Sequence, residues 1–62
     1  MLNFNQIMKI VEGKGYLEFS GNYYECVSYE NDLYVFQNVN DDSSFGISLS
    51  RLFEEGCYYK IK

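Results

Sequence analysis

A stretch of fourteen residues in the middle of the chain, Tyr23 to Phe36 (YYECVSYENDLYVF), restricts the fold more than any other. It holds five of the twelve aromatic residues, and aromatic and β-branched residues favour strands. The polar run Glu30–Asp32 in its middle is typical of a turn. A strand that covers one core alternates apolar and polar residues, but here rings stand at both positions of the alternation. The stretch therefore predicts a β-hairpin with rings on both faces.

The first residues carry the signals of a short helix. Asn3 is a suitable N-cap, and Gln6 follows three residues later, as in a capping box. Gly13 is a suitable stop at the C-terminal end. Apolar residues recur at the spacing of one helix face, at Phe4, Ile7, Met8 and Val11.

The rest of the chain predicts strands at 16–20, 23–29, 33–39 and 57–61, with an extended segment at 45–47. A second short helix is expected at Leu49–Glu55, capped by Ser48. The predicted fold class is α+β, with the N-terminal helix packed on a mostly antiparallel four-stranded sheet. The order is helix, three-strand meander, short helix, strand, and residues 1–62 form a single domain.

The expected turns assign the side chains of this sheet to two faces. The first turn is placed at Gly21–Asn22 and the second at Asn31–Asp32, which sets Tyr29 opposite Tyr34. The face that the first helix covers then holds Leu17, Phe19, Tyr24, Cys26, Leu33, Val35 and Val39. The opposite face holds Tyr16, Val27, Tyr29, Tyr34 and Phe36. A three-residue turn at 30–32 would swap the faces of the third strand.

The second aromatic face has two interpretations. One is an interface, with a second copy of the chain or with another protein, because tyrosine combines an apolar ring with a hydroxyl that tolerates water. The other is that the second helix folds over it with Leu52 and Phe53. A chain this short buries only about 60% of its unfolded surface, so an additional interface would supplement its core.

Catalytic and metal-binding patterns are missing from the sequence. The chain has no histidine, which removes the commonest general base and metal ligand. Asp41 and Asp42 lack the spacing of a calcium loop, and EGKG at 12–15 lacks that of a phosphate loop. Cys26 and Cys57 fit no zinc pattern and are expected as free thiols. We therefore expect no enzyme, no cofactor and no metal.

The charge of the chain is −4, and no basic residue lies between Glu18 and Asp42. A nucleic-acid-binding protein normally carries a basic face, so no direct contact with nucleic acid is expected. No apolar run approaches the ~18 residues of a membrane span, and no signal peptide is apparent at the N-terminus. These features predict a cytoplasmic protein without a membrane partner.

Both ends of the chain resemble a set of small phage and prophage proteins. The matching segments are NFNQIMKIVEGKGY (3–16) and ISLSRLFEEGCYYKIK (47–62). The set is similar to the family that includes Thoeris anti-defence proteins, oligomeric sponges that sequester a cyclic nucleotide signal. The resemblance implies a phage-type origin and a bacterial host cell. Gly15-Tyr16 and Cys57-Tyr58 stand where that family has an arginine and tryptophans, so no binding residue is carried over.

The leading hypothesis is a counter-defence inhibitor, comparable to anti-CRISPR proteins, that covers a basic surface of a host protein. Aromatic anchors carry interface energy, and acids steer a protein toward a basic partner. The predicted anchors are Tyr23, Tyr29, Tyr34 and Phe36, and the predicted steering charges are Glu25, Glu30 and Asp32. The alternatives are an oligomeric sponge for a nucleotide signal and a structural homo-oligomer without a ligand.

Overall fold

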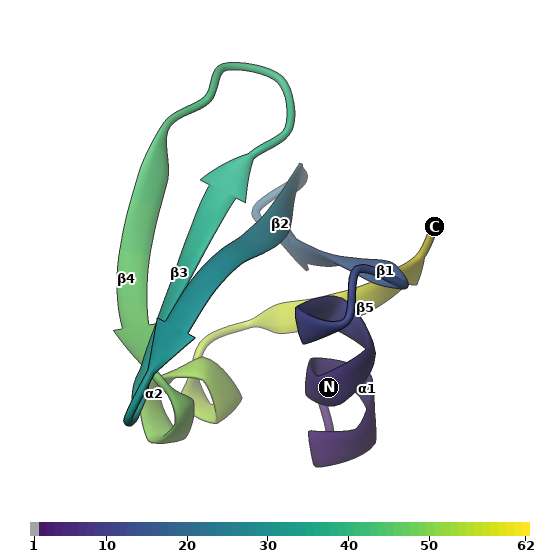
Figure 1. Cartoon of the computed structure of the whole chain (residues 1–62). Helices are drawn as coiled ribbons and strands as arrows, with labels where there is room; N and C mark the ends of the chain where they lie inside the picture. The colour runs from purple at the N-terminus through teal and green to yellow at the C-terminus, as the bar shows by residue number, and fades with distance from the viewer. Residues whose placement is uncertain (1) are drawn as a thin grey trace.

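A computed structural model of the chain describes residues 2–62 and shows a five-stranded antiparallel sheet with two helices (Figure 1). The predicted α+β class and the predicted order of elements are confirmed. The difference is one additional strand at 44–48, where an extended segment was expected. The elements are α1 (Phe4–Val11), β1 (Gly15–Phe19), β2 (Asn22–Glu30), β3 (Leu33–Asn38), β4 (Ser44–Ser48), α2 (Leu49–Glu54) and β5 (Cys57–Ile61).

Helix α1 begins and ends where its sequence signals predict. The Gln6 N–H donates to Asn3 Oδ1 at 2.9 Å, and the Asn3 N–H donates to Gln6 Oε1 at 3.2 Å, which completes a capping box. At the other end Gly13 has φ +83°, a conformation in which glycine carries no steric cost. The N–H of Lys14 returns to the carbonyl of Lys9 at 2.8 Å, as in a Schellman motif. The helix can therefore form from local signals alone.

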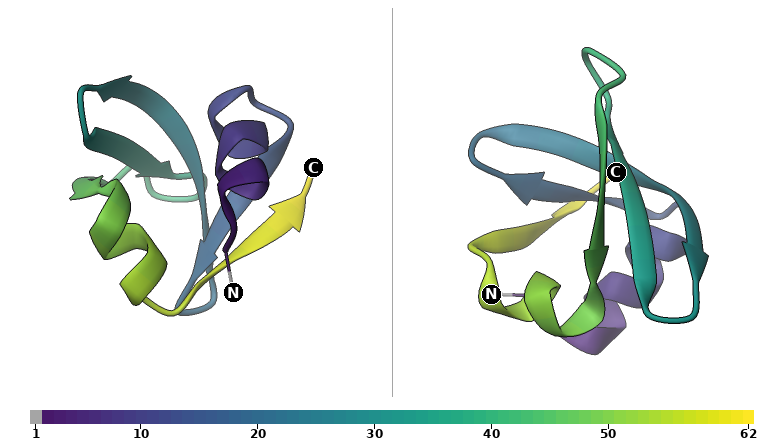
Figure 2. Two further views of the ribbon diagram at one scale, coloured as in Figure 1. Left: turned by 90° about the horizontal axis from the view of Figure 1, so that it is seen from below. Right: turned by 90° about the vertical axis from the view of Figure 1, so that its left-hand side faces the viewer.

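The strands of the sheet are ordered β4-β3-β2-β1-β5, so β4 and β5 are its two edges. Figures 1 and 2 show β1 and β5 turned strongly away from β3 and β4, with the long strand β2 passing between the two halves. Helix α1 packs on β1, β2 and β5, and α2 packs on β4. Both helices lie within the bend, where the core forms.

The first hairpin turns one residue earlier than predicted. Its loop is Ser20–Gly21, with φ values of +52° and +80°, and Leu17 stands opposite Tyr24. The predicted loop, Gly21–Asn22, is wrong. Because the loop lies one residue earlier, the partner of each β1 residue lies two positions earlier in β2 than predicted. A shift of two positions keeps each side chain of this hairpin on its predicted face.

The second hairpin contains a β-bulge at Val27 that the sequence did not predict. The pairing of Tyr29 with Tyr34 is confirmed, but the register shifts between Cys26 and Ser28, so Phe36 stands opposite Cys26. An extra residue in one strand exchanges the faces beyond it. The predicted faces of β3 are therefore reversed. Leu33, Val35 and Val39 leave the helix-covered face. Tyr34 and Phe36 join it, and so does Tyr29, which lies opposite Tyr34 beyond the bulge.

One core cluster joins both helices to the inner face of the sheet. Its buried apolar residues are Leu2, Ile7, Ile10, Leu17, Tyr34, Phe36, Leu52 and Cys57. Because Leu52 of α2 belongs to the same cluster as Ile7 of α1, the second helix does not cover a separate face, and that expectation is wrong. The outer face of the sheet carries no helix within residues 2–62. None of the described helices is both long enough and apolar enough to cross a membrane.

Candidate functional site

The seven predicted contact residues fall in three separate parts of the molecule. Phe36 is 1% exposed and Tyr34 is 7% exposed, so the prediction that both are surface anchors is wrong. The bulge at Val27 is the physical reason, because it turns both rings into the core. Phe36 packs against Phe45 of β4, with the ring centroids 5.7 Å apart. Replacing Phe36 would therefore disturb folding before it disturbed a surface.

Tyr23 and Glu25 lie on the outer face, next to β1 and β5. The ring of Tyr23 is 6.1 Å from that of Tyr16, and the Lys62 ammonium lies 5.2 Å from the Tyr16 ring. The same ammonium pairs with Glu25 Oε2 at 2.7 Å. The hydrogen bond to Glu25 raises the pKa of Lys62, because it favours the charged ammonium. Glu25 is thus already neutralised within the chain and contributes little steering charge.

Tyr29, Glu30 and Asp32 come together at the tip of the β2–β3 hairpin, which we call the hairpin tip. Asn31, with φ +57°, makes the tight turn between the strands. Tyr29 is 58% exposed and lies flat on Tyr34, with centroids 5.7 Å apart and an interplanar angle of 12°. The buried ring therefore holds the exposed ring in place, which lowers the entropy that an anchor loses on binding.

The two acids of the hairpin tip differ in their contacts. Within residues 2–62 neither Glu30 nor Asp32 forms an ion pair. Asp32 Oδ1 accepts a hydrogen bond at 3.3 Å from the N–H of Leu49, the first residue of α2. The turn is thereby tied to the second helix, while the charge of Glu30 remains free to act on a partner.

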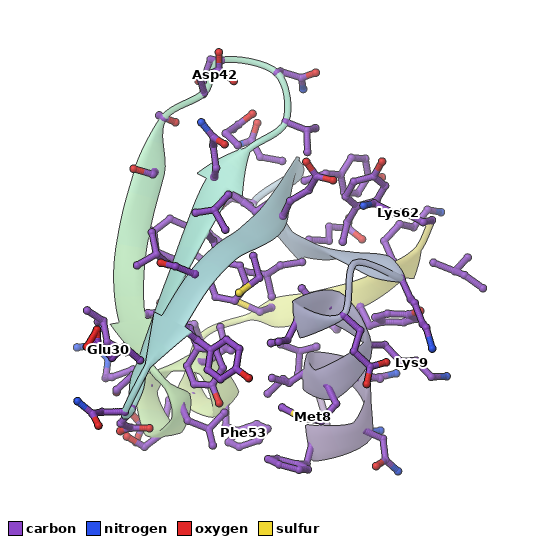
Figure 3. The ribbon with its side chains drawn as sticks, in the orientation of Figure 1. Met8, Lys9, Glu30, Asp42, Phe53 and Lys62 are labelled. Atoms are coloured by element: carbon purple, nitrogen blue, oxygen red, sulfur yellow. The ribbon has the colours of Figure 1, made fainter. Side chains whose placement is uncertain are left out.

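Apolar side chains of the two helices extend the surface beside the hairpin tip. Figure 3 shows Glu30, Phe53 and Met8 along the same lower edge of the molecule. Phe53 and Met8 are half-buried and pack against the core, and Phe4 on α1 is more exposed. Sequence reasoning did not assign these residues to a site. Phe4 and Met8 look like core positions by helical spacing alone, and only the position of the hairpin shows that they border a surface.

A second feature is a hollow of about 440 Å³ between β4, α2 and the start of β5. Its walls include the rings of Phe19, Tyr24 and Phe45, and the last two meet edge-to-face at 5.1 Å. Arg51 and Glu55 also line it and pair with each other at 3.3 Å. No sequence motif pointed to this hollow, because its walls come from segments that are far apart in the chain.

The two cysteines are free thiols, as expected. Burial raises the pKa of Cys26 and also that of Cys57, so both stay protonated at neutral pH. Among residues 2–62 no group of three or more cysteine or acidic side chains is placed to hold a metal ion. The side chains of residues 2–62 can offer a partner aromatic, hydrogen-bonding and charged contacts.

Comparison with known proteins gave no match: neither a family model, nor a curated protein, nor a solved structure matches the chain. The resemblance of its two ends to phage anti-defence proteins remains a prediction.

Proposed function

We propose that the chain is a non-enzymatic binding protein, encoded by a phage or prophage, that inhibits a host protein in the bacterial cytoplasm. The hairpin tip is the contact surface, and a basic surface of the host protein is its target. This revises the predicted site, because Tyr29, Glu30 and Asp32 remain while Tyr34 and Phe36 become its structural support. The resemblance to anti-defence proteins supports a counter-defence role of the anti-CRISPR kind.

The observation that carries the proposal is the stacked pair at the hairpin tip. Interface hot spots are enriched in tyrosine, and a preorganised ring keeps more of its contact energy as affinity. Tyr29 combines a 58% exposed ring with a buried partner, Tyr34, 5.7 Å away. A flexible loop tyrosine would lack this support.

The distribution of charge supports a basic target. Figure 3 shows Glu30 at one end of the molecule and Asp42 at the other, with Lys9 and Lys62 on a different side. Lys62 is also paired with Glu25. The hairpin tip thus presents uncompensated acids, which would accelerate association with a basic protein and suppress approach by acidic ones.

A pull-down from host lysate at low and moderate salt tests the proposal. The expected result is one host protein that is retained at low salt and lost as salt rises, because screening weakens contacts between exposed charges. Tyr29→Ala should abolish capture. Tyr58→Ala is the matched control, because Tyr58 is 53% exposed but lies on the outer face, and it should leave capture unchanged.

A second pair of variants tests the charges. Glu30→Gln with Asp32→Asn removes two charges but keeps an amide oxygen for the Leu49 N–H. Asp41→Asn with Asp42→Asn removes the same charge from the β3–β4 loop. Only the first pair should slow association, seen as a lower on-rate in surface plasmon resonance. Equal effects of both pairs would mean that net charge, rather than the hairpin tip, drives binding.

The hollow beside β4 supports a second candidate, the sequestration of a nucleotide signal. Its volume of about 440 Å³ lies within the range of small-molecule sites, and its aromatic rings could stack a base. Native mass spectrometry of the protein purified from infected cells tests this function. A bound nucleotide that Phe45→Ala removes and Tyr58→Ala retains would favour it. A ligand-free protein that still captures the host partner would exclude it.

A further inference from the structure

Strand β4 is an edge of the sheet that lacks the usual protection. Its sequence, Ser44-Phe45-Gly46-Ile47-Ser48, contains no charge and no proline, and its pairing with β3 runs without a bulge. Natural proteins protect free edges with charges, prolines or bulges, because an unpaired edge accepts another strand. An unprotected edge of five residues is therefore a candidate interaction surface.

The direction of the backbone groups along β4 follows from its pairing with β3. The Asn38 N–H donates to the Ser43 carbonyl at 2.7 Å, which places a bonded pair at the end of the β3–β4 ladder. Bonded pairs alternate along an antiparallel ladder, so Phe45 and Ile47 direct their N–H and C=O groups toward β3. The backbone groups of Ser44, Gly46 and Ser48 point toward the free edge.

The residues of this edge are symmetric about its central glycine. If a second β4 lies antiparallel with Gly46 opposite Gly46, then Phe45 meets Ile47 and Ser44 meets Ser48. The Gly46 pair would exchange two hydrogen bonds, because both of its backbone groups point outward. The same register also makes each Ser44–Ser48 position a bonded pair. We propose that two copies of the chain pair through β4 about a two-fold axis at Gly46.

On the outer face, the Leu33 side chain covers the central glycine of β4. A Cβ on Gly46 would lie 3.2 Å from the Leu33 Cδ1 atom, so the Leu33 side chain already lies over the glycine. Leu33 is 52% exposed in the single chain. In the pair, the two Leu33 side chains would lie on either side of the two-fold axis, above the two glycines. Each would gain apolar contact that it lacks in the single chain.

Charge also favours this edge over the rest of the surface. A chain with a charge of −4 repels its own copy wherever acids would meet. Strand β4 has no charged residue, so a close approach at this edge opposes no like charges within the ladder. Two-fold dimers are the commonest form of self-association, and their interface must be complementary to itself. The proposal does not rest on the host-protein contact, because it uses the backbone groups of β4, although the Ser48 end of that strand borders the hairpin tip through Leu33 and Asp32.

The test is the mass of the protein in solution, measured by light scattering over a range of concentrations. The expected mass is twice the 7.3 kDa of one chain at high concentration. Gly46→Lys sets two like charges opposite each other at the axis and should reduce the mass to that of one chain. Gly46→Ala adds the same Cβ without a charge and should keep the dimer. Circular dichroism should show that both variants fold.

Amide hydrogen exchange then identifies the edge that pairs. In the dimer, the amides of Ser44 and Gly46 should exchange more slowly as concentration rises. Phe19 and Asn22 close the β1–β2 turn as a bonded pair, and bonded pairs alternate from there across β1 to β5. The amides that point to the free edge of β5 are therefore those of Tyr59 and Ile61, and their exchange should be unaffected. A monomer at every concentration would overturn the proposal. Protection at both edges, with assemblies larger than two chains, would overturn it in favour of head-to-tail pairing of β4 with β5.

Discussion

The ring of Tyr29 lies flat on the ring of Tyr34, with an interplanar angle of 12°, and the two rings differ sharply in their burial. Tyr34 belongs to the core cluster, whereas most of Tyr29 faces solvent. One member of the pair is therefore structural, and the other is available for contact. Substitution of the two tyrosines should therefore change the free energy of unfolding by different amounts.

Tyr34→Ala should lower the free energy of unfolding by about 3 kcal/mol, because it leaves a cavity in the core. Tyr29→Ala should cost about 1 kcal/mol, the value of an aromatic pair without much buried area. Urea denaturation followed by circular dichroism measures both. Equal losses would show that Tyr29 is also a core residue, which would remove it from the proposed contact surface.

Asn3→Ala should lower the free energy of unfolding by about 1 kcal/mol, because the Gln6 N–H loses its acceptor at the start of α1. Asn5→Ala is the matched control, since Asn5 is exposed within the same helix and alanine favours helices. Thermal denaturation of the two variants measures the difference. If Asn5→Ala destabilised the protein as much as Asn3→Ala, the capping box would not be the stabilising element.

Gly15→Ala should destabilise the protein by about 2 kcal/mol, since a Cβ at this position would collide with the Tyr59 ring. That ring is held in place by the Tyr59 hydroxyl, which donates to the Lys14 carbonyl at 3.3 Å. In a Tyr59→Ala background the same glycine substitution should cost little. A double-mutant cycle measures the coupling, and additive effects would contradict the collision.

Ser43→Ala should raise the pKa of Asp41, which nuclear magnetic resonance titration of its carboxyl group can measure. The Ser43 Oγ–H donates to Asp41 Oδ1 at 2.7 Å and the Ser43 N–H donates at 2.9 Å, and both bonds lower the pKa of Asp41 below its ordinary value. Ser44→Ala should leave this pKa unchanged, because Ser44 is the exposed neighbour.

The lowered pKa of Asp41 also makes the stability of the protein depend on pH. Between the lowered folded pKa of Asp41 and its unfolded value of about 3.9, the unfolded state binds more protons. The stabilising contribution is therefore present above pH 4 and lost as the pH falls through the folded pKa. Ser43→Ala should weaken this acid-dependent loss, which unfolding curves between pH 2 and 5 would show. An unchanged pH profile would contradict the role of the serine.

Much of the fold was predictable because its signals are local. The caps of α1 at Asn3 and Gly13 act within a few residues, and the strand at Cys57–Ile61 alternates at its start, with Cys57 buried and Tyr58 exposed. Strand β4 was underestimated, since a central glycine is unfavourable in a strand. It forms because β3 supplies a partner along its whole length.

The candidate site was predictable only in part. Glu30 and Asp32 were identified because a polar turn between two strands is exposed. Tyr29 was assigned from the alternation of its strand, and it is exposed although it shares the face of Tyr34. Phe36 was misplaced because a bulge depends on how a sheet bends around its core, and no local pattern marks it. The hollow and the surface of Phe53 and Met8 join segments that are distant in sequence, so their assembly could not be predicted from spacing.

The bulge at Val27 makes this position the most tolerant one in its strand. The Val27 side chain is exposed, so most substitutions there should be tolerated. Removal of the whole residue should also be tolerated, because Cys26 opposite Phe36 and Ser28 opposite Val35 would then follow each other as in a regular ladder, and Tyr34 and Phe36 would stay in the core. Pairing of Val27 within the ladder would instead turn Leu33 and Val35 inward. Among descendants of this chain, position 27 should therefore vary both in identity and in presence.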